Sequence, residues 1–113
     1  MRLEAKKYLF DMRQAAALLA QFTAGKRFAD YDSDAMLRAA VEREFEIIGE
    51  ALGQLAKLDA ELGAGISEQR AIVAFRNILI HGYADVDDRL VWDVVETKLP
   101  TLVREIEALL ATD

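Results

Sequence analysis

The chain of 113 residues lacks cysteine and contains a single histidine and a single proline. The lack of cysteine excludes disulfides and thiolate metal sites, and it suits a reducing cytoplasm, which is the location we expect. One histidine argues against a histidine-rich metal site within one chain, so we expect no metal and no other cofactor. No apolar run approaches the roughly 20 residues of a membrane span. Residues 1–12 also lack the apolar core of a signal peptide.

An excess of positive charge is also missing, because the net charge is −6. Broad nucleic-acid platforms are usually basic, so the charge argues mildly against one. It leaves room for a small local anion site or for a basic protein partner. Hydrophobic residues make up 53% and charged residues 30% of the chain, as in a folded protein. We therefore expect one domain over residues 1–113.

Helical periodicity dominates the chain, and no strand signal competes with it. The expected long helices run from Leu3 to Thr23, from Asp34 to about Glu61, from Ser67 to about His81, and from about Asp88 onward. Pro100 interrupts the last of these and predicts a kink or two abutting helices. The sequence therefore predicts an all-α fold, an antiparallel helical bundle of four to five helices.

The expected helix boundaries carry ordinary start and stop signals. Gly25 is placed to end the first helix and Gly82 to end the third. Residues 25–33 read as a polar connector carrying two aromatics, after which Asp32 or Ser33 can cap the second helix. Ser67 can cap the third helix in the same way.

A stripe of small residues lies beside the apolar seam of the second helix. It consists of Gly49, Gly53, Ala56 and Ala60. Each glycine costs about 1 kcal/mol relative to alanine inside a helix, and a close helix–helix approach would compensate for that cost. The alternative is a pair of merely tolerated glycines.

The segment 76–83, RNILIHGY, sets four polar side chains into an otherwise apolar stretch. At 100° per residue, Arg76 projects from the middle of an apolar helix face. Asn77 and His81 form an i, i+4 pair on the adjacent face. Tyr83 would fall almost in line with Arg76 if the helix reached that far. The four side chains can therefore converge only around one edge of the helix end.

The chemistry of these four side chains suits a phosphodiester. A guanidinium forms a bidentate fork for phosphate oxygens, and an imidazole, with an ordinary pKa near ~6.5, exchanges protons at neutral pH. Asn77 can orient a substrate, and Tyr83 can stack or hydrogen-bond. Without a metal, the groups suit attack of an RNA 2′-hydroxyl on its neighbouring phosphate. A two-fold dimer would supply the second His81 that a base and an acid require.

Structural explanations for the same residues stay open at this point. His81 can compensate the helix dipole, Tyr83 can pack over the helix end, and Arg76 can form an ion pair with Glu46 or Glu50. These two glutamates either orient Arg76 or His81 from the second helix or belong to a solvated stripe.

The chain also resembles the HepT-like branch of the HEPN superfamily. The resemblance covers the chain from about Phe28 onward and rests on four landmarks in order: VEREFEIIGEALGQL at 41–55, the R-x4-H-x-Y signature at 76–83, Val91-Trp92, and Leu99-Pro100-Thr101-Leu102. It implies an all-helical homodimer in which the arginines and histidines of both subunits face one cleft.

The resemblance further implies a metal-independent endoribonuclease toxin of a type VII toxin–antitoxin module. Arg76 would stabilise the phosphate, His81 would transfer protons and Asn77 would support the site. Tyr83 matches the tyrosine that the cognate minimal nucleotidyltransferase antitoxin modifies with AMP, which silences the toxin. A bulky anionic adduct there would block phosphate entry.

Two other functions remain compatible with the sequence. The chain can be a non-catalytic nucleotide- or substrate-binding partner subunit of a minimal nucleotidyltransferase, or a structural helical dimer. For the ribonuclease, the acidic balance requires that RNA be drawn to a narrow basic site. The residues that could attract RNA to this site are Arg38, Arg43, Arg70 and Lys26.

Overall fold

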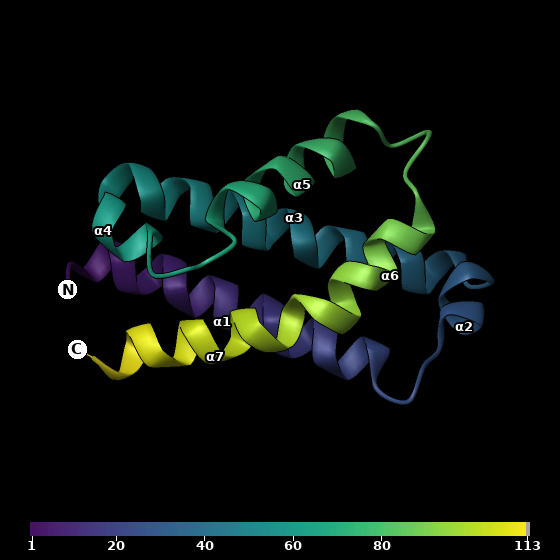
Figure 1. The fold of residues 1–113 in the computed structure, drawn as a ribbon, viewed down its shortest axis with the longest axis horizontal. Coiled ribbons are helices and arrows are strands. Elements are labelled where there is room, and N and C mark those ends of the chain that lie inside the picture. Colours follow the sequence, from purple (N-terminus) through teal and green to yellow (C-terminus); the bar gives the residue numbers. More distant parts are fainter. Residues whose placement is uncertain (113) are drawn as a thin grey trace.

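The computed structural model describes residues 1–112, which form seven helices and no strand (Figure 1). The helices are α1 (Leu3–Thr23), α2 (Phe28–Asp32), α3 (Ala35–Leu58), α4 (Ala60–Gly63), α5 (Gln69–His81), α6 (Asp88–Thr97) and α7 (Leu99–Ala111). The all-α prediction is confirmed. The number of helices exceeds the predicted four to five because α2 and α4 are single turns. Residue 113, the last of the predicted domain, lies outside the described residues.

The first connector is more ordered than the sequence predicted. Gly25, at φ 71°, ends α1 as expected, but residues 28–32 then form a helical turn. The prediction that Asp32 or Ser33 caps the next helix is therefore wrong, because both residues belong to the end of α2. Asp34 caps α3 instead, and its carboxylate accepts the backbone N–H groups of Met36 and Leu37.

The long second helix ends earlier than predicted. Asp59 breaks it, and its side chain accepts the N–H of Leu62 to begin α4. Ser67 is not a helix cap either. Its backbone N–H and hydroxyl both donate to the carboxylate of Glu105 on α7. The side chain that could have capped α5 is thus used to tie the preceding loop to the last helix.

Pro100 acts as the sequence predicted. The helix α6 ends at Thr97, and α7 begins at Leu99 with the proline in its first turn. A proline fits there because the first N–H groups of a helix have no intrahelical partner. The result is two abutting helices.

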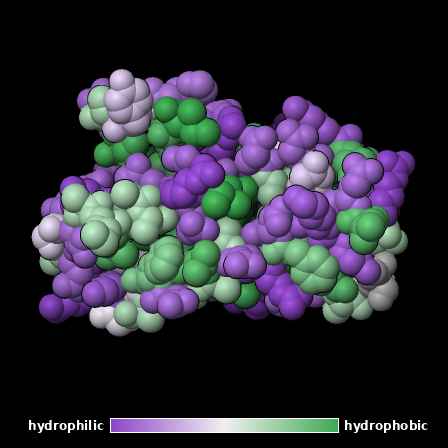
Figure 2. All heavy atoms as spheres, turned by 180° about the vertical axis from the view of Figure 1, so that it is seen from behind, coloured by the Kyte–Doolittle hydropathy of each residue, from purple (hydrophilic) through white to green (hydrophobic). Residues whose placement is uncertain are grey.

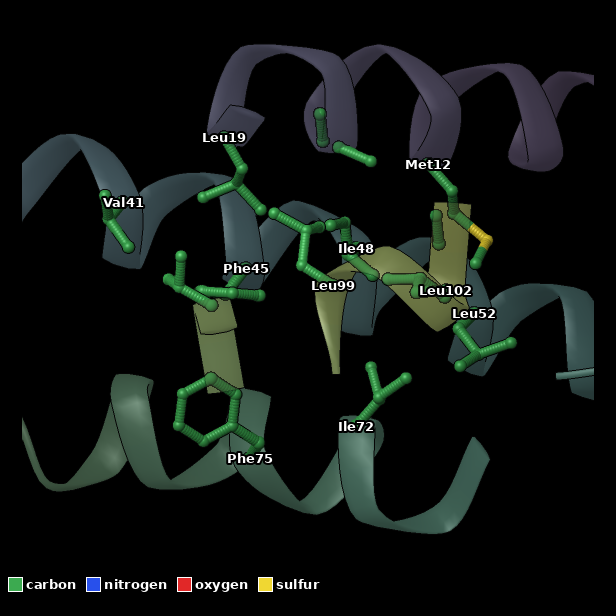
Figure 3. Close-up of a cluster of buried hydrophobic side chains, with 14 of the residues drawn as sticks. Met12, Leu19, Val41, Phe45, Ile48, Leu52, Ile72, Phe75, Leu99 and Leu102 are labelled. Atoms are coloured by element: carbon green, nitrogen blue, oxygen red, sulfur yellow. The ribbon is translucent and has the colours of Figure 1, made fainter. Parts of the chain in front are cut away.

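The core lies where α1, α5 and α7 surround α3 (Figures 1 and 3). Figure 3 shows that its side chains come from all four helices: Met12, Leu19, Val41, Phe45, Ile48, Leu52, Ile72, Phe75, Leu99 and Leu102. Phe45 and Phe75 meet edge to face, with ring centroids 5.3 Å apart. This contact and its apolar neighbours fix α5 against α3, so the polar cluster of α5 rests on a rigid base.

The prediction that residues 25–33 form a polar connector is wrong for Tyr31. Its side chain is fully buried, and its ring lies 5.3 Å from that of Trp92 on α6. The short helix α2 therefore contributes to the core. No helix among residues 1–112 is both long enough and apolar enough to span a bilayer.

Candidate functional site

The polar cluster predicted from the sequence occupies the last turns of α5. The helix ends at His81, where the backbone N–H of Gly82 donates to the carbonyl of Ile78. Tyr83 therefore lies in the following turn and does not continue the helical line of Arg76, as it would have in a longer helix. Arg76, Asn77 and His81 remain on the helix itself.

Arg76 is held in place from two sides. One terminal nitrogen, Nη2, lies 2.8 Å from Oε2 of Glu50 on α3. The other, Nη1, donates to Oδ1 of Asn77 at 2.9 Å. The side chain is 29% exposed, and its Nε is buried without a partner among the described residues. The stem is thus enclosed while the tip of the guanidinium stays open to a ligand.

Gly49 explains how an arginine fits between two packed helices. A Cβ atom on Gly49 would overlap the Cβ of Arg76 and lie 3.3 Å from the carbonyl oxygen of Ile72. Because only glycine leaves this space, α3 and α5 approach closely at this position. The predicted close approach is correct for Gly49. It is wrong for Gly53, where an added Cβ would meet nothing within 4 Å.

The side chains of His81 and Tyr83, unlike that of Arg76, are not held by neighbouring side chains in the described part of the chain. Both side chains are exposed, Tyr83 by 83%. Neither has a hydrogen-bond or ion-pair partner among residues 1–112. Asn77 is also exposed, and because its Oδ1 serves Arg76, its amide N–H groups remain available to a ligand. Arg76, Asn77, His81 and Tyr83 are called the α5 cluster below.

The two glutamates of α3 have different surroundings. Glu50 contacts Arg76, as described above. Glu46, whose side chain is 23% exposed, lies 3.4 Å from Arg43 on its own helix. Within residues 1–112, neither glutamate forms an ion pair or a hydrogen bond with His81.

A groove of about 220 Å³ opens beside Arg76, between α1, α3 and α5. Its apolar lining comes from Ile47, Ala51 and Ile80, and Tyr8 of α1 lines it as well. Sequence reasoning missed Tyr8. It stands 68 positions before Arg76 in the chain, so only the packing of α1 against α3 brings the two together.

The basic residues proposed to help RNA binding are spread over the molecule. Arg43 lines the groove, whereas Arg38 is engaged elsewhere, with Nη1 donating to the carbonyl of Asp32 and Nε lying 3.8 Å from Asp88. Lys26 and Arg70 are exposed and lie outside the lining of the groove. Arg43 is thus the one that adjoins Arg76.

A separate acidic group lies near Arg38, where α2, α3 and α6 meet. Burial, followed by the charges of Asp88 and Glu46, raises the pKa of Glu42. Burial, followed by a side-chain hydrogen bond that the protonated Asp88 carboxyl donates to Asp32, raises the pKa of Asp88. Burial is also the main cause that raises the pKa of Tyr31, whose hydroxyl has no hydrogen-bond partner among residues 1–112. These perturbed groups stand apart from the α5 cluster and belong to the packing of α2.

The α5 cluster thus joins an anchored cation to a free imidazole. An exposed guanidinium tip can bind one phosphate through two oxygens. An imidazole beside that phosphate can take up or release a proton. The combination suits the handling of a phosphate ester, with the cation stabilising developing negative charge.

Comparison with known proteins identifies the family of this chain. A family model described as "Ribonuclease HepT-like" matches residues 12–109. "Probable ribonuclease HepT" of Thermococcus cleftensis is 35% identical over 109 residues, covering 96% of this chain and 98% of the relative. "Putative RNase MJ1380" of Methanocaldococcus jannaschii is 32% identical over 104 residues, covering 92% and 94% respectively. No solved structure gives a significant match. The chain therefore belongs to the HepT-like ribonuclease family of the HEPN superfamily.

Proposed function

We propose that this protein is a metal-independent endoribonuclease toxin in which Arg76 and His81 carry the reaction. The observation that supports this most is the held guanidinium of Arg76, whose open tip lies on the same helix end as an unpartnered His81. The ribonuclease names of the family and of its relatives agree with the chemistry. Arg76 binds the scissile phosphate, His81 transfers protons, and Asn77 keeps the guanidinium oriented.

The reaction is an internal transfer within the RNA. A neutral imidazole takes the proton from the 2′-hydroxyl, whose oxygen forms a new bond to the adjacent phosphorus. The bond from phosphorus to the 5′-oxygen of the next nucleotide breaks, and an imidazolium protonates that oxygen. The products are a 2′,3′-cyclic phosphate and a 5′-hydroxyl. Arg76 stabilises the negative charge that builds on the phosphoryl oxygens.

The acid and the base come from two copies of the chain. Ala71, Ala74, Ile78 and His81 follow one another at spacings of three and four and so share one face of α5. Next to this face runs an apolar groove of about 320 Å³ between α5 and α6, lined by Leu90 and Val94 among others. Because Ile78 is 48% exposed, a second copy covering this face gains apolar burial and brings its own His81 to the cleft.

Tyr83 is the site of regulation in this proposal. Its exposed phenol, without a partner among the described residues, is open to a second enzyme. A cognate minimal nucleotidyltransferase antitoxin would join the phenolic oxygen to the α-phosphate of ATP, with loss of the phenolic proton and of pyrophosphate. The added AMP would place bulk and negative charge two residues from His81, where they repel an RNA phosphate. Intact mass after co-expression with the antitoxin tests this, since each modification adds one AMP unit.

Cleavage of a defined RNA in EDTA tests the ribonuclease. We expect the wild-type dimer to cut it and to leave 2′,3′-cyclic phosphate ends, and a 2′-deoxy sugar at the cut nucleotide to prevent the cut. Arg76→Ala should remove cleavage, while Arg70→Ala, an exposed arginine on the same helix, should retain it. Nucleotide binding that depends on Arg76 without any cleavage would identify the alternative, a non-catalytic partner subunit of a nucleotidyltransferase.

A further inference from the structure

We propose that the groove between α1, α3 and α5 is the seat of the nucleoside that flanks the scissile phosphate, with the Tyr8 ring against its base. This inference rests on the proposed ribonuclease function and adds the subsite that function needs. The groove shares Arg76 with the α5 cluster, since Arg76 forms part of its lining. A phosphate on the guanidinium therefore places its neighbouring nucleoside at the groove.

The surface of the groove matches the two-sided character of a nucleoside. Its apolar lining comes from the side chains of Ile47, Ala51 and Ile80, which suit the flat face of a base. Tyr8 also lines the groove and is half-buried, with its ring packed on the hydrophobic core and the ammonium of Lys7 over the ring, 5.9 Å from its centroid. Gln54 adds an amide to the lining, which suits the edge of a base or the sugar hydroxyls. Aromatic rings in such positions stack on unpaired bases.

The carboxylates around the groove do not repel a nucleotide strongly, because each has a cation as its partner. Asp11 lies 3.2 Å from Lys7, Glu46 lies 3.4 Å from Arg43, and Glu50 lies 2.8 Å from Arg76. Of the three cations, Arg43 and Arg76 themselves line the groove. Arg43 is 67% exposed, so its guanidinium is free to move from Glu46 to the next phosphate of an RNA strand.

The geometry of the reaction also requires a seat of this kind. The attacking 2′-oxygen must lie in line with the leaving 5′-oxygen, and a stacked A-form strand does not hold this arrangement. The flanking nucleoside must turn away from its neighbours, and proteins hold such unstacked bases on aromatic and apolar surfaces. Figure 2, the face opposite to that of Figure 1, shows the end of α5 as a raised lobe with hydrophobic side chains at its base. Ile80, the neighbour of His81 in the chain, lines the groove, so a strand seated in the groove lies close to the end of α5.

The test uses a single-stranded RNA hexamer with 2′-O-methyl groups, which lacks the attacking hydroxyl and reports binding alone. Tyr8→Leu in the full-length dimer should raise its dissociation constant about tenfold, as expected for the loss of one stacked base. Tyr8→Phe keeps the ring and should bind like the wild type. Phe10→Leu is the matched control, because Phe10 is an exposed aromatic on α1 outside this groove. Circular dichroism and dimer mass establish that each variant is folded.

The outcomes separate this proposal from the function on which it rests. Equal binding by Tyr8→Leu and the wild type overturns the subsite, even if the wild type cleaves RNA. Failure of the wild type to bind the hexamer also overturns it. Binding that Tyr8→Leu weakens supports the subsite, even if unmodified RNA is never cleaved, and cleavage then fails as a separate claim. Weaker binding of the nucleotidyltransferase partner in Tyr8→Leu, with RNA binding unchanged, makes the groove a protein-docking surface and overturns the proposal.

Discussion

Arg76 and His81 lie five residues apart on one helix, but their side chains differ in contacts and exposure. The guanidinium of Arg76 is fixed by Glu50 and Asn77, and its stem lies in the space that Gly49 leaves. His81 stands at the end of α5, exposed and without a partner in the described part of the chain. In our proposal a single chain thus contributes a fixed phosphate-binding half and an open proton-transfer half, and a second copy together with the RNA completes the open half.

The largest effect should come from altering the fixed half without removing its charge. Arg76→Lys retains a cation but loses the planar fork that contacts Glu50 and Asn77 together. We expect RNA cleavage in EDTA to fall about a hundredfold, the usual cost of removing one transition-state donor. Gel-based initial rates measure the loss. A lysine variant as active as the wild type would mean that only the positive charge matters and that the anchoring has no role in cleavage.

A second test separates the two glycines of α3. Gly49→Ala should destabilise the fold by about 1–3 kcal/mol, because the new methyl group overlaps the stem of Arg76. Gly53→Ala should instead stabilise it by about 0.5–1 kcal/mol, since helix propensity rises and no neighbour lies within 4 Å. Urea unfolding of the two variants measures both values. Equal effects in the two variants would contradict the close contact at Arg76.

Variants of Glu50 test whether its contact with Arg76 orients the guanidinium. Glu50→Gln keeps an oxygen acceptor while removing the charge that neutralises the guanidinium, so we expect KM for RNA to fall about threefold with kcat nearly unchanged. Glu50→Ala removes the acceptor as well, and kcat should fall about tenfold because the guanidinium loses its orientation. Global stability should change by less than about 1 kcal/mol in both, since the pair is partly exposed. Steady-state kinetics would contradict a positioning role if both variants changed KM alone.

The smallest expected effect concerns pH and lies away from the α5 cluster. Burial and neighbouring carboxylates raise the pKa of Glu42, so its carboxyl binds a proton more tightly in the folded state than in the unfolded state. Its contribution to stability is therefore greatest below the unfolded pKa and is lost as the pH rises through the folded pKa. Glu42→Gln should stabilise the protein by less than about 1 kcal/mol near neutral pH.

The pH dependence of the stability of Glu42→Gln, relative to that of the wild type, tests this explanation. The advantage of Glu42→Gln in thermal unfolding should disappear when the pH is lowered to about 4, where the wild-type carboxyl is protonated as well. Glu44→Gln is the control, because Glu44 lies on the same helix but is not among the charges that raise the pKa of Glu42. An advantage that stays constant with pH would assign the effect to the side-chain amide rather than to the lost charge.

Sequence patterns predicted correctly the features that neighbouring residues determine. The predictions were wrong for features that depend on contacts between segments far apart in the chain. The bounds of α1 and the break at Pro100 follow from periodicity and backbone restriction, which neighbours in the chain determine. The burial of Tyr31 was missed because its partner, Trp92, belongs to α6. Ser67 was expected to cap a helix, but Glu105 of α7 binds it instead. In each case a tertiary contact replaced the local one.

Within the candidate site, too, residues close in sequence were predicted and a distant one was missed. The α5 cluster was found because its four residues are close in sequence, and the contact of Glu50 with Arg76 was one of the two ion pairs named for Arg76 as a structural alternative. Tyr8 was not found, because no spacing relates it to Arg76. The glycine stripe predicted a close approach but could not tell Gly49 from Gly53, since that depends on where α5 crosses α3.

The most direct test of the central claim is the initial rate of RNA cleavage in EDTA by the His81→Ala variant beside that of the wild type. His81 is exposed and unpartnered among residues 1–112, so the variant should unfold at the same urea concentration as the wild type. The account predicts that it is folded, dimeric and still able to bind the 2′-O-methyl hexamer, with cleavage lost. Cleavage at the wild-type rate by the folded variant would contradict proton transfer by His81.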